Sequence, residues 1–142
     1  MKNALLLVTL LFFTCCSKKE NGHTFYYTAK SFDQRDSAFL QLNISDNTFH
    51  GTYIVTYFDN KKDSGSVEGS IFGDTLKGRY RFISRNNSLF VQPILFLKKD
   101  KKLILGSGDI YTYLNIPFYK QETIKFNDSS FIFNPLSTIK SD

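Results

Sequence analysis

Apolar side chains recur at every second position along most of this chain, and this alternation restricts the folds open to it. The period of two runs through residues 37–44, 49–57 and 76–82. Such a period places alternate side chains on opposite faces of a β-strand. The pattern therefore predicts an antiparallel, all-β protein in which each strand buries one face and exposes the other.

A two-residue turn at Gly73-Asp74 allows the register of one hairpin to be predicted. Centring the hairpin there brings apolar residues and glycines together on one face, and places the one strand carboxylate opposite an arginine. The predicted pairs are Ile71 with Leu76, Gly69 with Gly78, Val67 with Tyr80, Ser70 with Lys77 and Glu68 with Arg79.

The next turn is expected at Asn86-Asn87, because Asn tolerates a positive φ. The pairs that follow are Phe82 with Val91, Tyr80 with Pro93, Gly78 with Leu95 and Leu76 with Leu97. In this register Leu89, Val91, Leu95 and Leu97 face inward, while Phe90, Ile94 and Phe96 face outward. Across the Lys98–Lys102 turn, Leu103 and Leu105 are expected opposite Leu97 and Leu95.

The strand over residues 89–97 is thus apolar on both faces, so its outer face needs a cover. We expect the C-terminal segment to supply this cover, rather than a partner protein or the membrane surface. The segment contains Ile124, Phe126, Phe131 and Phe133, which themselves need apolar surroundings.

About eight to ten short strands fit into residues 23–142, which we interpret as one all-β domain. Repeated pairing of neighbouring strands favours a meander closed as a barrel, with a two-sheet β-sandwich as the alternative. The composition agrees, because 15 Phe and 8 Tyr against three Ala disfavour a helical bundle. Glycines on the inner face, in residues 49–53, 67–71 and 76–80, indicate sharp coiling or the close approach of a ring.

Residues 1–15 are expected to be a signal peptide. Lys2 precedes an apolar run of about ten residues, which is too short to span a membrane. The run ends in Thr14-Cys15-Cys16, an ending that resembles a bacterial lipoprotein signal. That resemblance implies lipidation of Cys16, with Cys15 as the alternative, and residues 16–22 then form the lipidated Cys and a short tether. Two or three acyl chains suffice for stable anchoring.

Catalytic and metal-binding patterns are not found in the sequence. The histidines are His23 and His50, and both cysteines precede residue 17, so no cluster with metal-ligand spacing occurs. No serine lies in a strand-turn-helix elbow with a histidine base. We therefore expect a protein that is not an enzyme and that needs no cofactor or metal.

Two surface features remain. Lys77, Arg79 and Arg81 form a basic stripe on one predicted strand face, and Lys98, Lys99, Lys101 and Lys102 form a basic turn. A solvated face explains both, and an anionic partner such as a lipid head group, a polysaccharide or an acidic protein is the functional interpretation. The charge would also suit nucleic acid, but the expected envelope location argues against that partner, and we expect none. Asp36-Ser37-Ala38 and Asp74-Thr75-Leu76 resemble short O-glycosylation motifs, which makes Ser37 and Thr75 candidate acceptors.

Residues 65–108 resemble small uncharacterised lipoproteins of Bacteroidota-type bacteria. The resemblance is carried by Gly69-Ser-Ile-Phe-Gly-Asp-Thr-Leu-Lys-Gly-Arg-Tyr80 and by Leu103-Ile-Leu-Gly-Ser-Gly108. It implies a lipocalin-like (calycin-type) barrel, although the lipocalin Gly-x-Trp signature is missing because the chain has no Trp. No catalytic residues are carried over.

These features predict an envelope lipoprotein that is anchored by N-terminal acyl chains. We expect the outer membrane to hold the anchor, and the sequence leaves open whether the protein faces the periplasm or the cell surface. We expect a non-enzymatic binding module for a small apolar ligand or an envelope protein. The alternative is an inhibitor that protects against a lysozyme-like enzyme.

Overall fold

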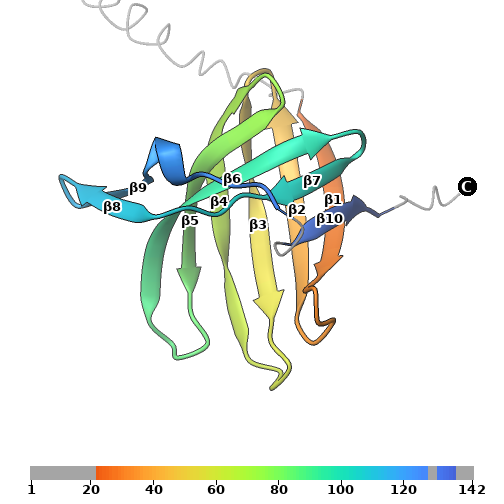
Figure 1. Ribbon diagram of the computed structural model, residues 1–142. Helices are drawn as coiled ribbons and strands as arrows, with labels where there is room; N and C mark the ends of the chain where they lie inside the picture. The colour runs from red at the N-terminus through yellow and green to blue at the C-terminus, as the bar shows by residue number, and fades with distance from the viewer. Residues whose placement is uncertain (1–21, 128–130, 137–142) are drawn as a thin grey trace, which may run out of the picture.

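The computed structural model describes residues 22–127 and 131–136. Eight antiparallel strands close a barrel in the order β1-β10-β7-β6-β5-β4-β3-β2 (Figure 1). The strands are β1 (His23–Lys30), β2 (Ser37–Ser45), β3 (Thr48–Thr56), β4 (Lys62–Phe72), β5 (Thr75–Ile83), β6 (Leu89–Lys99), β7 (Lys102–Leu105) and β10 (Ile132–Pro135). The predicted all-β meander is confirmed as a closed barrel rather than a sandwich.

Three short elements lie outside the barrel. Strands β8 (Ile110–Tyr113) and β9 (Ile116–Tyr119) form a separate hairpin, and the 3₁₀ helix η1 (Gln121–Thr123) follows it. The hairpin projects sideways from the barrel wall in Figure 1, with β9 next to β6. Only after this excursion does the chain return, as β10, to fill the place between β7 and β1.

The predicted register of the hairpin around Gly73 is confirmed in every pair, including Gly69 opposite Gly78 and Glu68 opposite Arg79. Gly73 adopts a φ of 57°, which glycine tolerates without a steric penalty. The close approach at the facing glycines is also confirmed. A Cβ atom on Gly78 would overlap the Glu68 carbonyl oxygen and would lie 2.9 Å from Cζ of Phe49.

The predicted register of the next hairpin is wrong by one residue. The structure pairs Ile83 with Leu89 and Phe82 with Phe90, not Phe82 with Val91. The connection is a longer loop closed by the Ser84 amide donating to the Ser88 carbonyl at 2.8 Å. Within it Asn87 has a φ of 60°, whereas Asn86 is not left-handed. A turn followed by one left-handed residue is the usual three-residue hairpin loop, and its odd length shifts the register.

The predicted register of the hairpin between β6 and β7 is also wrong by one residue, in the opposite direction. Leu97 lies opposite Ile104 and Phe96 opposite Leu105, instead of Leu97 opposite Leu103. Here the turn is Asp100-Lys101, in which Asp100 takes a φ of 56°. The expected pairing is centred on Asp100 itself, whereas the observed pairing is centred between Asp100 and Lys101.

These shifts reverse the predicted faces of β6, because a one-residue slip moves every side chain to the other side. Ile94 and Phe96 point into the core, while Leu95 is buried on the outside, close to Phe126. Phe126 of the predicted C-terminal segment and strand β9 cover this outer face around Leu95, whereas Leu89 and Val91 at the start of β6 stay exposed. Phe133 does not take part in this cover, because it lies fully buried inside the barrel.

The middle of the barrel is filled by a cluster of aromatic rings. Tyr53 lies 4.8 Å from Tyr80, 6.4 Å from Phe96 and 5.9 Å from Phe133, measured between ring centroids. The Tyr80 hydroxyl donates a hydrogen bond to the Tyr53 carbonyl at 3.0 Å, so its polar atom is satisfied despite burial. Burial raises the pKa values of Tyr53 and Tyr80, which keeps both hydroxyls neutral.

Candidate functional site

The barrel has two different ends. One end carries the start of β1, the β2–β3, β4–β5 and β6–β7 turns and the end of β10, and we call it the mouth end. The other end carries the three loops over residues 31–36, 57–61 and 84–88, and we call it the loop end. Figure 1 shows the mouth end at the top and these loops at the bottom.

A cavity of about 350 Å³ lies at the mouth end. Its lining is mainly apolar and comes from strands that are far apart in the sequence. The lining residues are Phe25 and Tyr27 of β1, Ile44 of β2, Leu76 of β5, Lys98 of β6, Asp100 and Lys101 of the β6–β7 turn, Leu103 of β7 and Pro135 of β10. The volume falls in the lower part of the range of small-molecule sites.

The deeper lining consists of buried side chains. Leu76 and Leu103 are each 3% exposed and Tyr27 is 9% exposed, whereas Phe25 is 43% exposed. Burial raises the pKa of the Tyr27 hydroxyl, so this group stays a neutral phenol at physiological pH. Since the aromatic cluster fills the barrel beyond this level, the cavity is a cup at the mouth rather than a tunnel.

Charged groups stand on one side of the cup. Lys98, Asp100 and Lys101 are exposed and belong to the β6–β7 hairpin tip. The backbone amide of Lys98 donates to the Asp74 carbonyl at 2.7 Å, which joins this tip to the β4–β5 turn. The cup can therefore surround an apolar group and offer two cations to an anionic or polar end.

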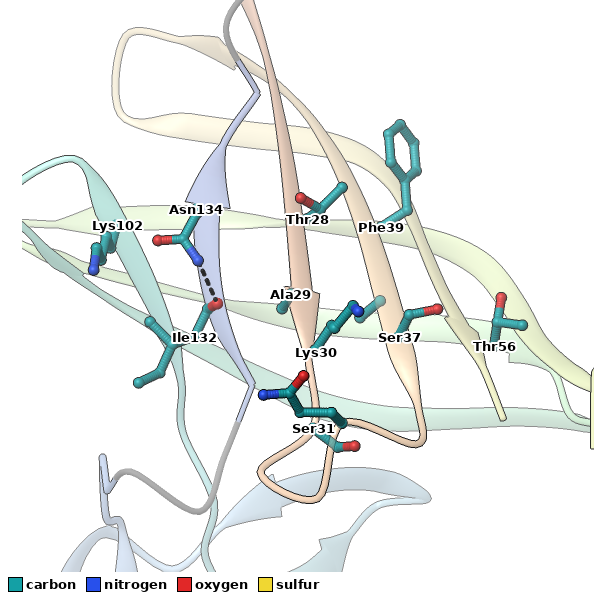
Figure 2. A pocket seen from close by; sticks show the side chains of 12 residues that line it. Thr28, Ala29, Lys30, Ser31, Ser37, Phe39, Thr56, Lys102, Ile132 and Asn134 are labelled. Carbon is teal, nitrogen blue, oxygen red and sulfur yellow. Dashed lines mark hydrogen bonds between the residues drawn. The ribbon is translucent and has the colours of Figure 1, made fainter. Parts of the chain in front are cut away.

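A larger depression, of about 720 Å³, lies on the outside of the barrel along β1 and β10 (Figure 2). It follows from the short pairing of these strands, which extends over Tyr27 and Thr28 only. Asn134 turns its side-chain amide back toward the Ile132 carbonyl at 3.4 Å, as Figure 2 shows. The rim of this depression is polar, with Ser37 and Lys102 on opposite sides, and the depression is open to solvent.

The predicted basic stripe exists as an exposed row on the outside of β5. Lys77, Arg79 and Arg81 all point away from the core, and Arg79 stands opposite Glu68. Lys77 and Arg79 also line a space of about 210 Å³ under the β8–β9 hairpin. The stripe is therefore separate from the cup, and its predicted anionic partner stays a prediction.

Other predicted sites are placed as follows. Thr75 is half-buried beside the β4–β5 turn and Ser37 is exposed at the start of β2. Cys15 and Cys16, with the rest of the signal and the tether up to residue 21, lie outside the described residues. Glycosylation and lipidation of these residues remain predictions.

The loop end is braced by contacts between its loops. The Phe58 amide donates to Asp36 Oδ1 at 3.0 Å, and the Arg85 amide donates to Asp63 Oδ1 at 2.6 Å. Tyr57 donates its hydroxyl to Asp63 Oδ2 at 2.7 Å, and burial together with this hydrogen bond raises the pKa of Tyr57 to about 12.

Two guanidinium groups at the loop end lie over aromatic rings. Arg35 stands 4.3 Å from the centre of the Phe58 ring, and Arg85 stands 4.5 Å from that of Tyr57. Phe32 and Phe58 remain 84% and 64% exposed. This end therefore presents exposed aromatic side chains to solvent, of which Phe58 is held by its contact with Arg35.

The sequence interpretation identified the basic turn at residues 98–102 but missed the cup beside it. The sequence feature that could have revealed the cup is the alternation of Phe25 and Tyr27 in β1, which places both on the inner face.

In the parts of the chain that the structure describes, no group of three or more His, Cys, Asp or Glu side chains could hold a metal ion. Over the same ranges, no helix has the length and apolar character needed to cross a membrane.

Comparison of the chain with protein-family models, with curated proteins and with solved structures finds no match. The eight-stranded antiparallel barrel is consistent with the calycin-like fold that the sequence resemblance implies. Function is therefore inferred from the geometry of this barrel.

Proposed function

We propose that the protein is a lipid-anchored, non-enzymatic binding module of the cell envelope that holds a small apolar ligand in the cup at the mouth end. The proposal rests on a mainly apolar cavity of about 350 Å³ at one end of a barrel whose middle is filled by core side chains. Anchoring is supported by the sequence, in which Cys15 and Cys16 follow a short apolar run after a single threonine, Thr14.

The lining favours an elongated ligand with one polar end. Leu76 and Leu103 offer apolar contact in the buried part of the cup, while Lys98 and Lys101 stand at its edge. Burying apolar ligand surface contributes about 25 cal/mol per Å² of area removed from water. A hydrocarbon chain with a polar or anionic head satisfies both parts of the lining.

Binding can be tested with N-phenyl-1-naphthylamine, an apolar probe that fluoresces when it leaves water. A tryptophan introduced in the lining would fill the cup with its indole ring, and the natural chain has no other Trp. We expect saturable binding to the natural chain and a loss of affinity of about tenfold or more in Leu103→Trp. The matched control is Leu89→Trp, since Leu89 is 69% exposed at the loop end.

A second variant tests the same site independently, in case Leu103→Trp does not fold. Phe25→Arg changes a lining residue that is 43% exposed, so it leaves the buried core untouched. It should weaken probe binding while the thermal unfolding midpoint stays close to that of the natural chain. Equal probe affinity in the natural chain and in both cup variants would refute the proposed ligand site.

A second candidate function is the inhibition of a lysozyme-like enzyme through the loop end. The observation in its favour is the exposure of Phe32 and Phe58 on loops that are held by hydrogen bonds and cation–π contacts. Fixed aromatic side chains are typical anchors of protein interfaces. Retention on immobilised lysozyme that is lost in Phe32→Ser would support this function, and no retention would remove it.

A further inference from the structure

The chain enters the barrel at the mouth end. Strand β1 begins at His23, which lies opposite Ile44 near the β2–β3 turn. Residues 1–21, with the apolar run and Cys16, therefore join the described chain beside the opening of the cup. The seven steps from Cys16 to His23 span about 25 Å at most, even when the chain is fully extended.

The mouth end also presents an exposed aromatic ring. Phe72 is 65% exposed and immediately precedes Gly73 at the tip of the β4–β5 turn. The hydrogen bond from Lys98 to Asp74 holds this turn against the β6–β7 tip. An aromatic ring at such a position is suited to the interfacial layer of a bilayer.

Four lysines surround the β6–β7 turn, and all four are exposed: Lys98, Lys99, Lys101 and Lys102. Lys99 and Lys102 are paired directly across the two strands, where like charges repel each other. Within the described residues none of the four belongs to an ion pair, and the one acidic group among them is Asp100. An anionic surface would relieve the repulsion.

The mouth end carries two further carboxylates, Asp46 and Asp74, on the neighbouring turns. The excess of positive charge is therefore concentrated on the β6–β7 tip. At the loop end, by contrast, Lys61 is paired with Asp59 at 3.4 Å, and Arg35 and Arg85 lie over aromatic rings. Lys30 and Lys62 at the loop end are exposed as well, but within the described residues the four lysines of the β6–β7 tip form the larger cluster of cations outside ion pairs.

From these observations we propose that the mouth end is a membrane-docking surface, on which Phe72 enters the interface and the β6–β7 lysines contact anionic lipid head groups. The inference rests on the proposed function for the anchor, because the anchor brings a bilayer within reach. Each lysine close to an anionic membrane strengthens docking roughly fivefold. The cup then opens toward the bilayer, so its ligand can pass from the lipid phase without crossing water.

The orientation can be measured with single-tryptophan variants of the full, lipidated chain in vesicles of phosphatidylethanolamine and phosphatidylglycerol. Phe72→Trp reports on the mouth end and Phe58→Trp on the loop end, and the two parent side chains are 65% and 64% exposed. The ends are separated by a tilted strand of nine residues, or roughly 20 Å. We expect brominated lipids to quench Phe72→Trp at least about twofold more strongly than Phe58→Trp.

The charge contribution is tested in the Phe72→Trp background. Replacing Lys98, Lys99, Lys101 and Lys102 by Gln should lower the docked fraction about tenfold or more, as should vesicles without phosphatidylglycerol. A matched control replaces four other exposed lysines by Gln, so that the net charge changes equally and docking persists. These control residues are Lys30, Lys62, Lys120 and Lys125.

Equal quenching at both positions, or stronger quenching of Phe58→Trp, would overturn the docking proposal. So would equal effects of the two sets of lysine replacements. Probe binding to the cup is measured without vesicles, on the natural chain and on variants that keep Phe72, so failure of the cup as a ligand site is seen separately. Quenching of Phe72→Trp in a protein that binds no probe would leave docking intact and refute the ligand.

Discussion

Replacement of Phe133 by Ala should remove a large part of the stability of the barrel. Phe133 is fully buried, and its ring centre lies 5.7 Å from Phe96, 5.9 Å from Tyr53 and 6.1 Å from Phe131. Truncation of a core Phe to Ala costs about 3–5 kcal/mol, because apolar contact is lost and a cavity remains. We expect a loss of about 4 kcal/mol, against a total unfolding free energy of about 5–15 kcal/mol for a typical domain.

The position of Phe133 makes the loss large. Strand β10 has four residues, and it is paired with β1 and with β7 over two residue pairs each. The ring of Phe133 therefore adds a large apolar contact to the short backbone pairing of the strand that closes the barrel. Without it, amides of β1 and β7 next to β10 should exchange with solvent faster than the rest of the sheet.

Urea unfolding followed by far-ultraviolet circular dichroism measures the change. At an unchanged m-value of about 2 kcal/mol per molar, the midpoint should fall by about 2 M. The control is Phe32→Ala, because Phe32 is 84% exposed and its loss should change the free energy by about 0.5 kcal/mol or less. A loss below about 1.5 kcal/mol in Phe133→Ala would refute the role of β10 in closing the core.

Three further predictions follow from particular residues. Gly78→Ala should lower the thermal midpoint, because its Cβ would overlap the backbone of β4; an unchanged midpoint would contradict the close approach. Burial and the hydrogen bond to Asp63 raise the pKa of Tyr57 from 10.0 to about 12, so its protonated form favours the folded state. That stabilisation is complete below pH 10 and is lost as the pH rises through 12. Between pH 10 and 12 the free energy of unfolding should therefore fall less in Tyr57→Phe than in the natural chain, whereas equal falls would argue against it. Cys16→Ala should abolish labelling with palmitate, and continued labelling would assign the lipid to Cys15.

The sequence predicts this fold well where a turn has a distinctive residue. Gly73 needs a positive φ, so it marks the centre of its hairpin, and every predicted pair there is observed. Asn87 also has a positive φ, but Asn86 does not. Since both are asparagines, the sequence does not distinguish a two-residue turn from a loop one residue longer. This ambiguity is the reason that the predicted inner and outer faces of β6 are the reverse of the observed ones.

The cup is harder to predict than the barrel. Its lining joins β1, β2, β5, β6, β7 and β10, so its shape depends on barrel closure between segments that are distant in the sequence. Phe133 illustrates the difficulty, because its apolar character predicts burial but not on which side of β6 it lies. The charged edge was easier to find, because Lys98, Lys99, Lys101 and Lys102 are neighbours in the chain.

The pairing of β1 with β10 has a consequence for the order of folding. The first and the last strand must meet, and the loop between them contains the rest of the barrel, so the entropy cost of this contact is the largest in the sheet. Until the C-terminal strand is available, β1 and β7 are open edges, and such edges recruit strands from other chains. A chain shortened before Ile132 should therefore associate with its own copies, because β1 and β7 would stay open at the barrel's seam.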